Sequence, residues 1–456
     1  MPQHYDSIII GAGQAGPPLA ARLAAAGQQV ALIERRWLGG TCVNDGCTPT
    51  KTLVASARVA WLAGRAADFG VSAGPVAVDM AALRARKDKV VLASRHGLES
   101  WLGGLDRVRL IYGEGRFVSP HEVAVNDEVL AADTIYLNTG ARAVVPDWVG
   151  DAPYLTSTSI LELAELPRHL VIVGGSYVGL EFAQMYRRFG AAVTVLQRGP
   201  RLLGKEDADI SDAIHTILEE DGIRVVTGVK ELAATALPDG VSVSFAAGGV
   251  PQAVEGSHLL VAIGRTPNVE GLGLEAIGVK QEESGCIEVD DRLRTSVPHI
   301  FALGDVNGRG AFTHTSYNDF EIVSQNLLDG ADRKVSDRVP TYAVYIDPPL
   351  GRAGMTEAEA LRAGRRVLKA TRPMTRVSRA TERGETRGFM KVVADADTGE
   401  ILGAALLGIE ADEVVHLLLD AMANGVGFEA IKRTMHIHPT VSELVPTLLG
   451  DLKPAA

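Results

Sequence analysis

The sequence predicts an α/β protein with two Rossmann-like dinucleotide-binding domains and a C-terminal α+β domain. Two glycine-rich turns, at residues 11–16 and 174–179, each join an apolar strand to a helix, as in a dinucleotide-binding fold. The C-terminal part is organised differently, with paired strands expected at 388–394 and 401–408 and a helix at 410–424. These observations indicate two cofactor-binding units followed by a domain of another kind.

The composition is that of an ordinary globular chain of several domains. Of the 456 residues, 46% are hydrophobic and 22% charged, which excludes a disordered, collagen-like or coiled-coil protein. The net charge of −11 argues against nucleic acid or an anionic membrane as a partner. The sequence has no apolar stretch long enough to span a bilayer and no basic region before its first strand, so we expect a cytoplasmic protein. Three cysteines are too few for a disulfide framework.

The first glycine turn has the full dinucleotide fingerprint. A strand at residues 5–10 leads into G-A-G-Q-A-G, and the next strand ends at Glu34. Gly11 permits the tight turn, Gly13 lets a pyrophosphate approach the backbone, and Gly16 lets helix and strand pack closely. The Glu34 carboxylate is expected to accept hydrogen bonds from ribose hydroxyls.

The second fingerprint departs from the first where it contacts the ribose. It reads G-G-S-Y-V-G from Gly174 to Gly179, and its second strand ends in Gln197-Arg198 instead of an acidic residue. A carboxylate there would repel a 2′-phosphate, whereas an arginine would hold it. Arg198 therefore favours NADPH. The alternative is that Arg198 is solvated and that NADH binds through other contacts.

Three later strands also end in glycine turns, at Thr139-Gly140, Gly264-Arg265 and Gly304-Asp305. Asp305 is placed to bind a ribityl or ribose hydroxyl. Together with two fingerprints about 160 residues apart, these turns indicate two dinucleotides, one held permanently and one that exchanges.

Cys42 and Cys47, with four residues between them, form a candidate redox pair at the start of a predicted helix over 50–63. A helix N-terminus lowers the pKa of a thiol, which makes a thiolate available near neutral pH. Two alternatives are buried free thiols, which behave as small apolar groups, and a metal site. A metal would need further ligands, and only Cys286 and scattered histidines remain, so no metal site is predicted. Cys286 is expected on a strand as part of the core.

The segment G-G-T-C-x-N-x-G-C-x-P-x-K at 39–51 is similar to the redox segment of the flavoprotein disulfide reductases, the class I pyridine nucleotide-disulfide oxidoreductases. Glutathione reductase, dihydrolipoyl dehydrogenase and mercuric reductase belong to this family, and the resemblance covers essentially the whole chain. It implies an FAD domain (1–145 with 266–335), an inserted NAD(P)H domain (146–265) and a dimer-interface domain (336–456).

The resemblance also implies roles for individual residues. Cys42 would attack the substrate, and Cys47 would lie against the flavin and form a charge-transfer complex with it. Lys51 would sit near flavin N5, paired with Glu181, and Tyr177 would cover the nicotinamide pocket. Further positions expected to contact cofactor are Gly40, Thr41, Gly115, Thr139, Gly140, Gly264, Asp305 and Thr313.

Thiol–disulfide chemistry requires a base, and a histidine, with an ordinary pKa near 6.5, can take and return the proton. The C-terminal segment H-I-H-P-T-V-S-E contains His438 and Glu443. By the family resemblance, His438 is the base, Glu443 orients it, and both reach Cys42 of the other subunit in a homodimer. His436 has no assigned role.

These features predict an FAD-dependent, NADPH-preferring enzyme that reduces a low-molecular-weight disulfide. The chain ends without the cysteine pair of mercuric reductases, although several segments resemble the bacterial branch labelled mercuric-reductase-like. Three alternatives stay open: a reductase of Hg(II) or Cu(II), a dihydrolipoyl dehydrogenase, and a non-enzymatic redox-sensing subunit. Gln197-Arg198 counts against the dehydrogenase, which normally keeps an acidic residue there. On the helix after Lys51, Arg58 and Trp61 are expected either to contact an acidic or aromatic substrate, or to be a solvated arginine and a half-buried tryptophan.

Overall fold

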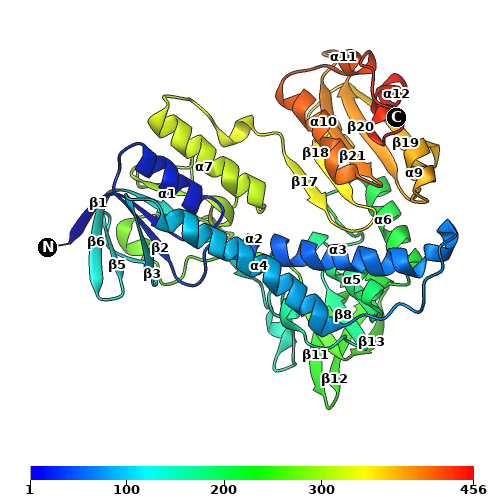
Figure 1. The fold of residues 1–456 in the computed structure, drawn as a ribbon, viewed down its shortest axis with the longest axis horizontal. Helices are drawn as coiled ribbons and strands as arrows, with labels where there is room; N and C mark the ends of the chain where they lie inside the picture. The colour runs from blue at the N-terminus through cyan, green and yellow to red at the C-terminus, as the bar shows by residue number, and fades with distance from the viewer. Residues whose placement is uncertain (1, 456) are drawn as a thin grey trace.

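The computed structural model describes residues 2–455, and Figure 1 shows its three main sheets. The first is centred on four parallel strands in the order β3-β2-β1-β6, which β5 and β4 extend as antiparallel strands; β16 also pairs with β6. Strand β2 is buried along its whole length, as expected for a parallel sheet covered on both faces. The strands span Gln3–Ile10 (β1), Val30–Glu34 (β2), Val108–Tyr112 (β3), Arg116–Ser119 (β4), Glu122–Val125 (β5), Glu128–Leu137 (β6) and Ile300–Ala302 (β16).

The second sheet is again parallel, in the order β10-β9-β8-β14, and a three-stranded antiparallel sheet, β11-β12-β13, packs beside it. A two-stranded ribbon of β7 and β15 lies near the connections between the first and second sheets. The strands are β7 (Ala141–Ala143), β8 (His169–Val173), β9 (Ala192–Gln197), β10 (Arg224–Thr227), β11 (Lys230–Leu237), β12 (Gly240–Ala247), β13 (Val250–Gly256), β14 (His258–Val261) and β15 (Arg265–Pro267).

The third sheet is C-terminal and antiparallel, in the order β17-β18-β21-β20-β19-β22. The two expected strands occur as its centre, β20 and β21, and the helix expected at 410–424 is α10 (Ala411–Ala423). The predicted fold class, two Rossmann-like units and an α+β domain, is therefore correct. The strands of this C-terminal sheet are β17 (Thr341–Val344), β18 (Leu350–Gly354), β19 (Val367–Pro373), β20 (Phe389–Asp395), β21 (Ile401–Leu407) and β22 (Lys453–Pro454).

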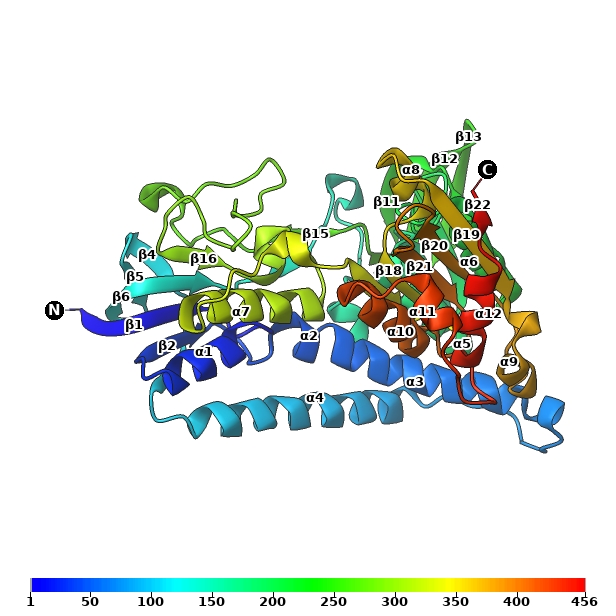
Figure 2. The same cartoon turned by 90° about the horizontal axis from the view of Figure 1, so that it is seen from above.

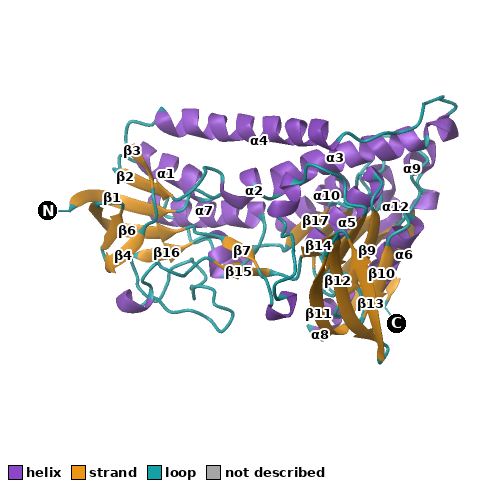
Figure 3. Cartoon of the chain, turned by 90° about the horizontal axis from the view of Figure 1, so that it is seen from below, coloured by secondary structure: helices purple, strands orange, loops and turns teal. Residues whose placement is uncertain are grey.

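Two long helices lie in the chain between β2 and β3 of the first sheet. Helix α3 (Cys47–Gly64) and helix α4 (Met80–Gly103) lie side by side along one side of the molecule (Figures 2 and 3). Helix α3 starts three residues before the prediction, so Cys47 is its first residue. Pro49 is tolerated there because the N–H it lacks would have no partner in the first turn. None of the helices in residues 2–455 is long and apolar enough to cross a membrane. The other α-helices are α1 (Gly16–Ala25), α2 (Gly40–Asn44), α5 (Tyr177–Phe189), α6 (Ala208–Glu220), α7 (Thr313–Leu328), α8 (Glu357–Arg362), α9 (Ser378–Glu382), α11 (Phe428–Lys432) and α12 (Val445–Gly450).

The expectation for Cys286 is wrong. The residue follows a turn that ends at Gly285, where φ is +82°, and it belongs to no strand. Its side chain is half-buried, and it lies against Gly308, where an added Cβ would come 2.9 Å from its sulfur. The glycine turn ends the extended backbone that an apolar-strand interpretation of S-G-C-I-E-V requires.

Candidate active site

The redox segment is folded closely onto the first fingerprint. Gly39 and Gly40 both have positive φ, and a Cβ on Gly40 would lie 2.8 Å from the Cα of Gly13. Only glycine at position 40 lets the two turns approach this closely. The short helix α2 then carries Cys42, and α3 begins at Cys47, so both sulfurs lie at the edge of one cavity.

The two thiols share one proton. The Cys42 thiol donates to Cys47, and this bond, together with a contact of 3.4 Å from Cys47 Sγ to Thr313 Oγ1 and the charge of Lys51, lowers the pKa of Cys47 to about 6 against the opposing effect of burial. The same bond and burial raise the pKa of the Cys42 thiol. The opposite directions of the two pKa shifts favour Cys47 as the thiolate and Cys42 as the protonated thiol.

Lys51 lies one turn after Cys47 on α3 and forms an ion pair with α5. Its Nζ is 2.7 Å from Glu181 Oε2, and the Tyr345 backbone N–H donates to Glu181 Oε1 at 2.9 Å. The ammonium also lies 4.7 Å from the centre of the Tyr345 ring, within range of a cation–π contact. The positive charge is thus held beside the Cys47 sulfur by groups from two other elements.

A cavity of about 940 Å³ runs from the first fingerprint past both cysteines to the start of α5, and its volume is within the range of cofactor sites. Asn138, which sequence reasoning missed, joins the strand ends around it: its Oδ1 accepts from Gly16 N at 3.1 Å and its Nδ2 donates to Leu303 O at 2.8 Å. The predicted residues that line the cavity are Gly11, Gly13, Glu34, Gly40, Thr41, Cys42, Cys47, Lys51, Gly115, Thr139, Gly140, Tyr177, Glu181, Asp305 and Thr313.

The cavity wall fits a flavin dinucleotide. A Cβ on Gly13 would lie 2.8 Å from Asn138 Oδ1, so the turn keeps its backbone open toward the cavity. Arg265, another cavity residue, has a buried Nε without a hydrogen-bond partner, 3.6 Å from Asp305 Oδ2. Burial raises the pKa of Asp305 because it disfavours the carboxylate, and hydroxyl donors from a ligand would stabilise that charged form. Glu34 accepts from Ala12 N and Arg36 N, both at 2.8 Å.

The second fingerprint forms the same kind of turn. A Cβ on Gly179 would lie 1.9 Å from Gly174 O, so both positions require glycine. Gln197 Oε1 accepts from Gly175 N at 2.9 Å, and the Arg198 side chain beside it is exposed. Five of the predicted cofactor-binding positions are not part of the cavity wall: Gly16, Gly174, Gly179, Arg198 and Gly264.

His438 and Glu443 lie apart from the cavity, on the loop between α11 and α12. His438 Nδ1 is 2.8 Å from Glu443 Oε2, which leaves Nε2 open, and the His438 side chain is 73% exposed. The neighbouring Met435 and Ile437 are 95% and 79% exposed. His436 Nδ1 lies 2.9 Å from Ser442 O within the same loop. One chain therefore does not bring His438 to Cys42.

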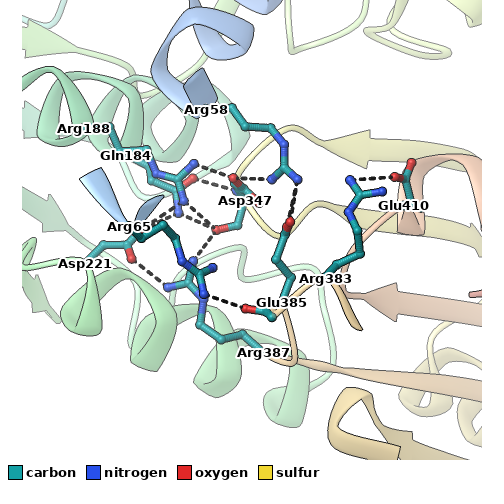
Figure 4. A network of polar contacts seen from close by, with 11 residues as sticks. Arg58, Arg65, Gln184, Arg188, Asp221, Asp347, Arg383, Glu385, Arg387 and Glu410 are labelled. Carbon is teal, nitrogen blue, oxygen red and sulfur yellow. Dashed lines mark hydrogen bonds and ion pairs between the residues drawn. The ribbon is translucent and has the colours of Figure 1, made fainter. Parts of the chain in front are cut away.

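Arg58 is half-buried, and two carboxylates hold its guanidinium group. It donates to Asp347 Oδ2 at 2.8 Å and to both oxygens of Glu385 at 2.8 and 2.9 Å (Figure 4). Trp61 is half-buried, with guanidinium groups of Arg65 and Arg188 4.5 and 4.6 Å from its ring. The acidic partners of Arg58 lie about 300 residues away in the sequence, which is why the sequence left its role open.

Residues 5–319 match the family described as pyridine nucleotide-disulphide oxidoreductase, and residues 340–449 match the dimerisation domain of the same family. The chain belongs to this family. It is an oxidoreductase of the disulfide-reductase class, as the redox segment predicted. Among residues 2–455, no group of three or more His, Cys, Asp or Glu side chains is placed to hold a metal ion.

Three curated relatives show how broad the family is. The chain is 36% identical to the probable pyridine nucleotide-disulfide oxidoreductase RclA of Escherichia coli, with 98% of this chain and 99% of the relative aligned. It is 33% identical to the dihydrolipoyl dehydrogenase of Geobacillus stearothermophilus (96% and 94%) and 34% identical to the mercuric reductase of Bacillus cereus (96% and 70%). The solved structure of the HOCl-induced flavoprotein disulfide reductase RclA superposes with a TM-score of 0.87 at 34% identity, covering 98% and 99% of the two chains.

Proposed function

We propose that this protein is a homodimeric, FAD-dependent reductase that takes electrons from NADPH and reduces a low-molecular-weight disulfide at Cys42 and Cys47. The observation that carries this proposal is the placement of Cys42 and Cys47 at the wall of one large cavity, next to the Lys51–Glu181 ion pair. We assign FAD to residues 1–145 with 266–335, the nicotinamide nucleotide to 146–265, and the dimer interface to 336–456. We place the enzyme in the cytoplasm, where a dithiol stays reduced.

Gly11, Gly13, Glu34 and Asp305 of the cavity wall would hold FAD, which would supply two-electron transfer between the nicotinamide and the Cys42–Cys47 disulfide. Cys42, Cys47 and His438 then carry out the thiol–disulfide exchange with the substrate. Cys42 gives its proton to His438 Nε2 of the second subunit and attacks the substrate disulfide RSSR; a Cys42–SR bond forms, and the departing RS⁻ takes the proton from His438. The Cys47 thiolate next attacks Cys42 Sγ, which restores the Cys42–Cys47 disulfide and releases the second RS⁻, which takes its proton from water.

Two observations support NADPH over NADH. Gln197 holds the turn at Gly175 without contributing a negative charge, and the exposed Arg198 follows it directly. A 2′-phosphate at this strand end would meet a cation and no carboxylate. NADH remains the competing donor because neither side chain blocks a ribose hydroxyl.

A second candidate is reduction of a metal ion, either Hg(II) or Cu(II). Several relatives are mercuric reductases, and one solved structure of RclA is a Cu(II) complex, with a TM-score of 0.88 and 34% identity over 99% of each chain. A thiolate next to a second thiol is a suitable ligand pair for a soft metal. A dihydrolipoyl dehydrogenase, as in the relatives of that name, is the third candidate.

The deciding experiment is nicotinamide oxidation by the purified holoenzyme with a panel of small disulfides, lipoamide, Hg(II) and Cu(II). We expect NADPH-dependent turnover of a disulfide that Cys42→Ser abolishes, while reduction of the flavin by NADPH continues. Metal-dependent oxidation that survives His438→Ala, without turnover of any disulfide, would replace the proposal with the metal reductase. Preferred turnover of lipoamide with NADH would replace it with the dehydrogenase.

A further inference from the structure

Helices α3 and α5 are joined twice along one seam, at positions two turns apart on each helix. The joining residues are Lys51 and Arg58 on α3, and Glu181 and Arg188 on α5. A spacing of seven residues is close to two helical turns, so each pair lies on one face of its helix. Both junctions also include the short segment 345–347, which follows β17 of the C-terminal sheet.

The inner junction is the Lys51–Glu181 pair already described, with the Tyr345 N–H on the second oxygen of Glu181. The Glu181 side chain is 4% exposed and the Lys51 side chain 30%. This junction lies next to Cys47, because Lys51 is one turn further along the same helix.

The outer junction is centred on Asp347. Its Oδ2 accepts from Arg58 Nη1 at 2.8 Å and from Arg188 Nη1 (Figure 4). The side-chain amide of Gln184 pairs with the Asp347 backbone, since Asp347 N donates to Gln184 Oε1 at 2.7 Å and Gln184 Nε2 donates to Asp347 O at 2.8 Å. The side chains of Arg188 and Asp347 are only 5% and 9% exposed.

Further ion pairs tie the outer junction to its surroundings. Arg387 donates to Asp347 O at 2.9 Å and to Asp221 Oδ1 at 2.7 Å, and Glu385 holds the other end of the Arg58 guanidinium (Figure 4). Asp347 is the only carboxylate that bonds to both α3 and α5 within this network of described residues. Removing its charge would leave each guanidinium with a carboxylate that does not reach the other helix: Arg58 with Glu385, and Arg188 with Asp221.

We propose that Asp347 is a positioning residue: by fastening Arg58 of α3 to Arg188 of α5, it fixes the two helices in register and so holds the Lys51 ammonium beside Cys47. Apolar packing, which includes Leu53 and Ala57 of α3, already holds the two helices together, and two junctions about 10 Å apart fix their register at both ends of this contact. The inference rests on the proposed function only in that Cys47 is the thiolate beside the flavin.

The readout is the ionisation of Cys47, because Lys51 lowers its pKa. In a Cys42→Ser background the serine hydroxyl still donates to the sulfur and only Cys47 titrates at this pair. The thiolate is followed in the holoenzyme by the long-wavelength absorbance that a thiolate gives against an oxidised flavin. The groups that face this sulfur, besides residue 42, are Lys51, Tyr177, Glu181, Thr313 and Tyr345.

The test variant is Asp347→Asn, which keeps the backbone bonds to Gln184 and removes the charge. We expect the pKa of Cys47 to rise by about 0.5 to 1 unit, which is a threefold to tenfold change in its ionisation constant. Glu385→Gln is the matched control, because it removes the other charged partner of Arg58 and leaves the Asp347–Arg188 pair intact. In this variant the pKa of Cys47 should stay within about 0.2 unit of its value in the parent.

An unchanged pKa in Asp347→Asn would overturn the proposal, even if the melting temperature fell, because a structural role alone moves only stability. If Asp347→Asn does not fold, Arg58→Gln breaks the same junction from α3 and has the same expected shift. A Cys42→Ser parent that shows no long-wavelength absorbance at any pH would instead count against the proposed redox site. The two failures are therefore distinguishable.

Discussion

Glu34 and Gln197 make the same hydrogen bond in the two nucleotide-binding folds. Each stands at the end of the second parallel strand and accepts from a backbone N–H of the preceding glycine turn: Glu34 Oε2 from Ala12 at 2.8 Å, and Gln197 Oε1 from Gly175 at 2.9 Å. The glutamine thus keeps the structural bond of the acidic residue and removes its charge. At this position the two folds therefore differ in the charge of the side chain and not in its hydrogen bond.

From this relationship we predict that Arg198→Ala lowers kcat/KM for NADPH by about tenfold to a hundredfold, because a hydrogen bond to a charged group contributes about 1.5–3 kcal/mol. The value for NADH should change by less than about threefold, since NADH lacks the phosphate. Gln197→Glu should also lower kcat/KM for NADPH, because the new carboxylate would repel the 2′-phosphate. Steady-state kinetics with both nucleotides measures this, and an equal loss for NADPH and NADH would show that Arg198 does not contact the phosphate.

The ionisation of Cys47 predicts a pH dependence. With a pKa of about 6, lowered from its ordinary value, the thiolate is present at pH 7 and is lost as the pH falls through 6. Thr313→Val removes the contact to the sulfur and should raise this pKa by about one unit, so that the loss occurs at higher pH. Titration of the thiolate absorbance in the dithiol enzyme measures both values. Cys286→Ser is the control, and a titration unmoved by Thr313→Val would remove that hydroxyl from the site.

The parts of the site that were predictable from sequence are those in contiguous motifs. The redox segment places Cys42, Cys47 and Lys51 within ten residues of one another, so local pattern determines their arrangement. Asn138 was missed because its function depends on partners 122 and 165 residues away. In the sequence, Asn138 is a single polar residue before Thr139-Gly140, and this is a weaker signal than a contiguous motif.

Long-range pairing also explains why the role of Arg58 stayed open in the sequence. A basic residue on a helix near a redox site suggests a substrate contact until its acidic partners are known, and Asp347 lies 289 residues further along. The domain class was predictable because each Rossmann unit carries its own fingerprint. How the C-terminal sheet meets α3 and α5 was not, because segment 345–347 contains no motif of its own.

A buried lysine predicts a large effect on stability. The Lys391 side chain on β20 is 2% exposed. Its Nζ lies 2.8 Å from carboxylate oxygens of Asp209 and Glu357 and 3.1 Å from Asp207. These ion pairs join the C-terminal sheet to the start of α6. Lys391→Met should destabilise the protein by about 3–5 kcal/mol, because the carboxylates lose their common counter-ion. Lys369→Met is the control: Lys369 pairs with Glu357 but is 39% exposed, and it should cost about 1 kcal/mol or less. Urea unfolding compares the two, and equal losses would contradict the assignment.

The exposed His438–Glu443 pair predicts an active site shared between two subunits. His438 is 73% exposed and lies outside the cavity that contains Cys42, so the imidazole of one chain serves the thiol of the other in the proposed dimer. His438→Ala should slow disulfide turnover by about 10²–10⁴ while NADPH still reduces the flavin at the parent rate. Single-turnover and steady-state measurements separate the two steps.

Mixed dimers decide whether the base acts across the interface. A dimer of one Cys42→Ser subunit and one His438→Ala subunit contains a single intact site only if His438 serves the opposite chain, because the unmodified Cys42 of one subunit then meets the unmodified His438 of the other. We therefore expect two inactive homodimers to regain about half of the parent activity per mixed dimer after subunit exchange, with half of the sites restored. If His438 acted within its own chain, every site in the mixed dimer would carry one lesion, and mixing would restore nothing.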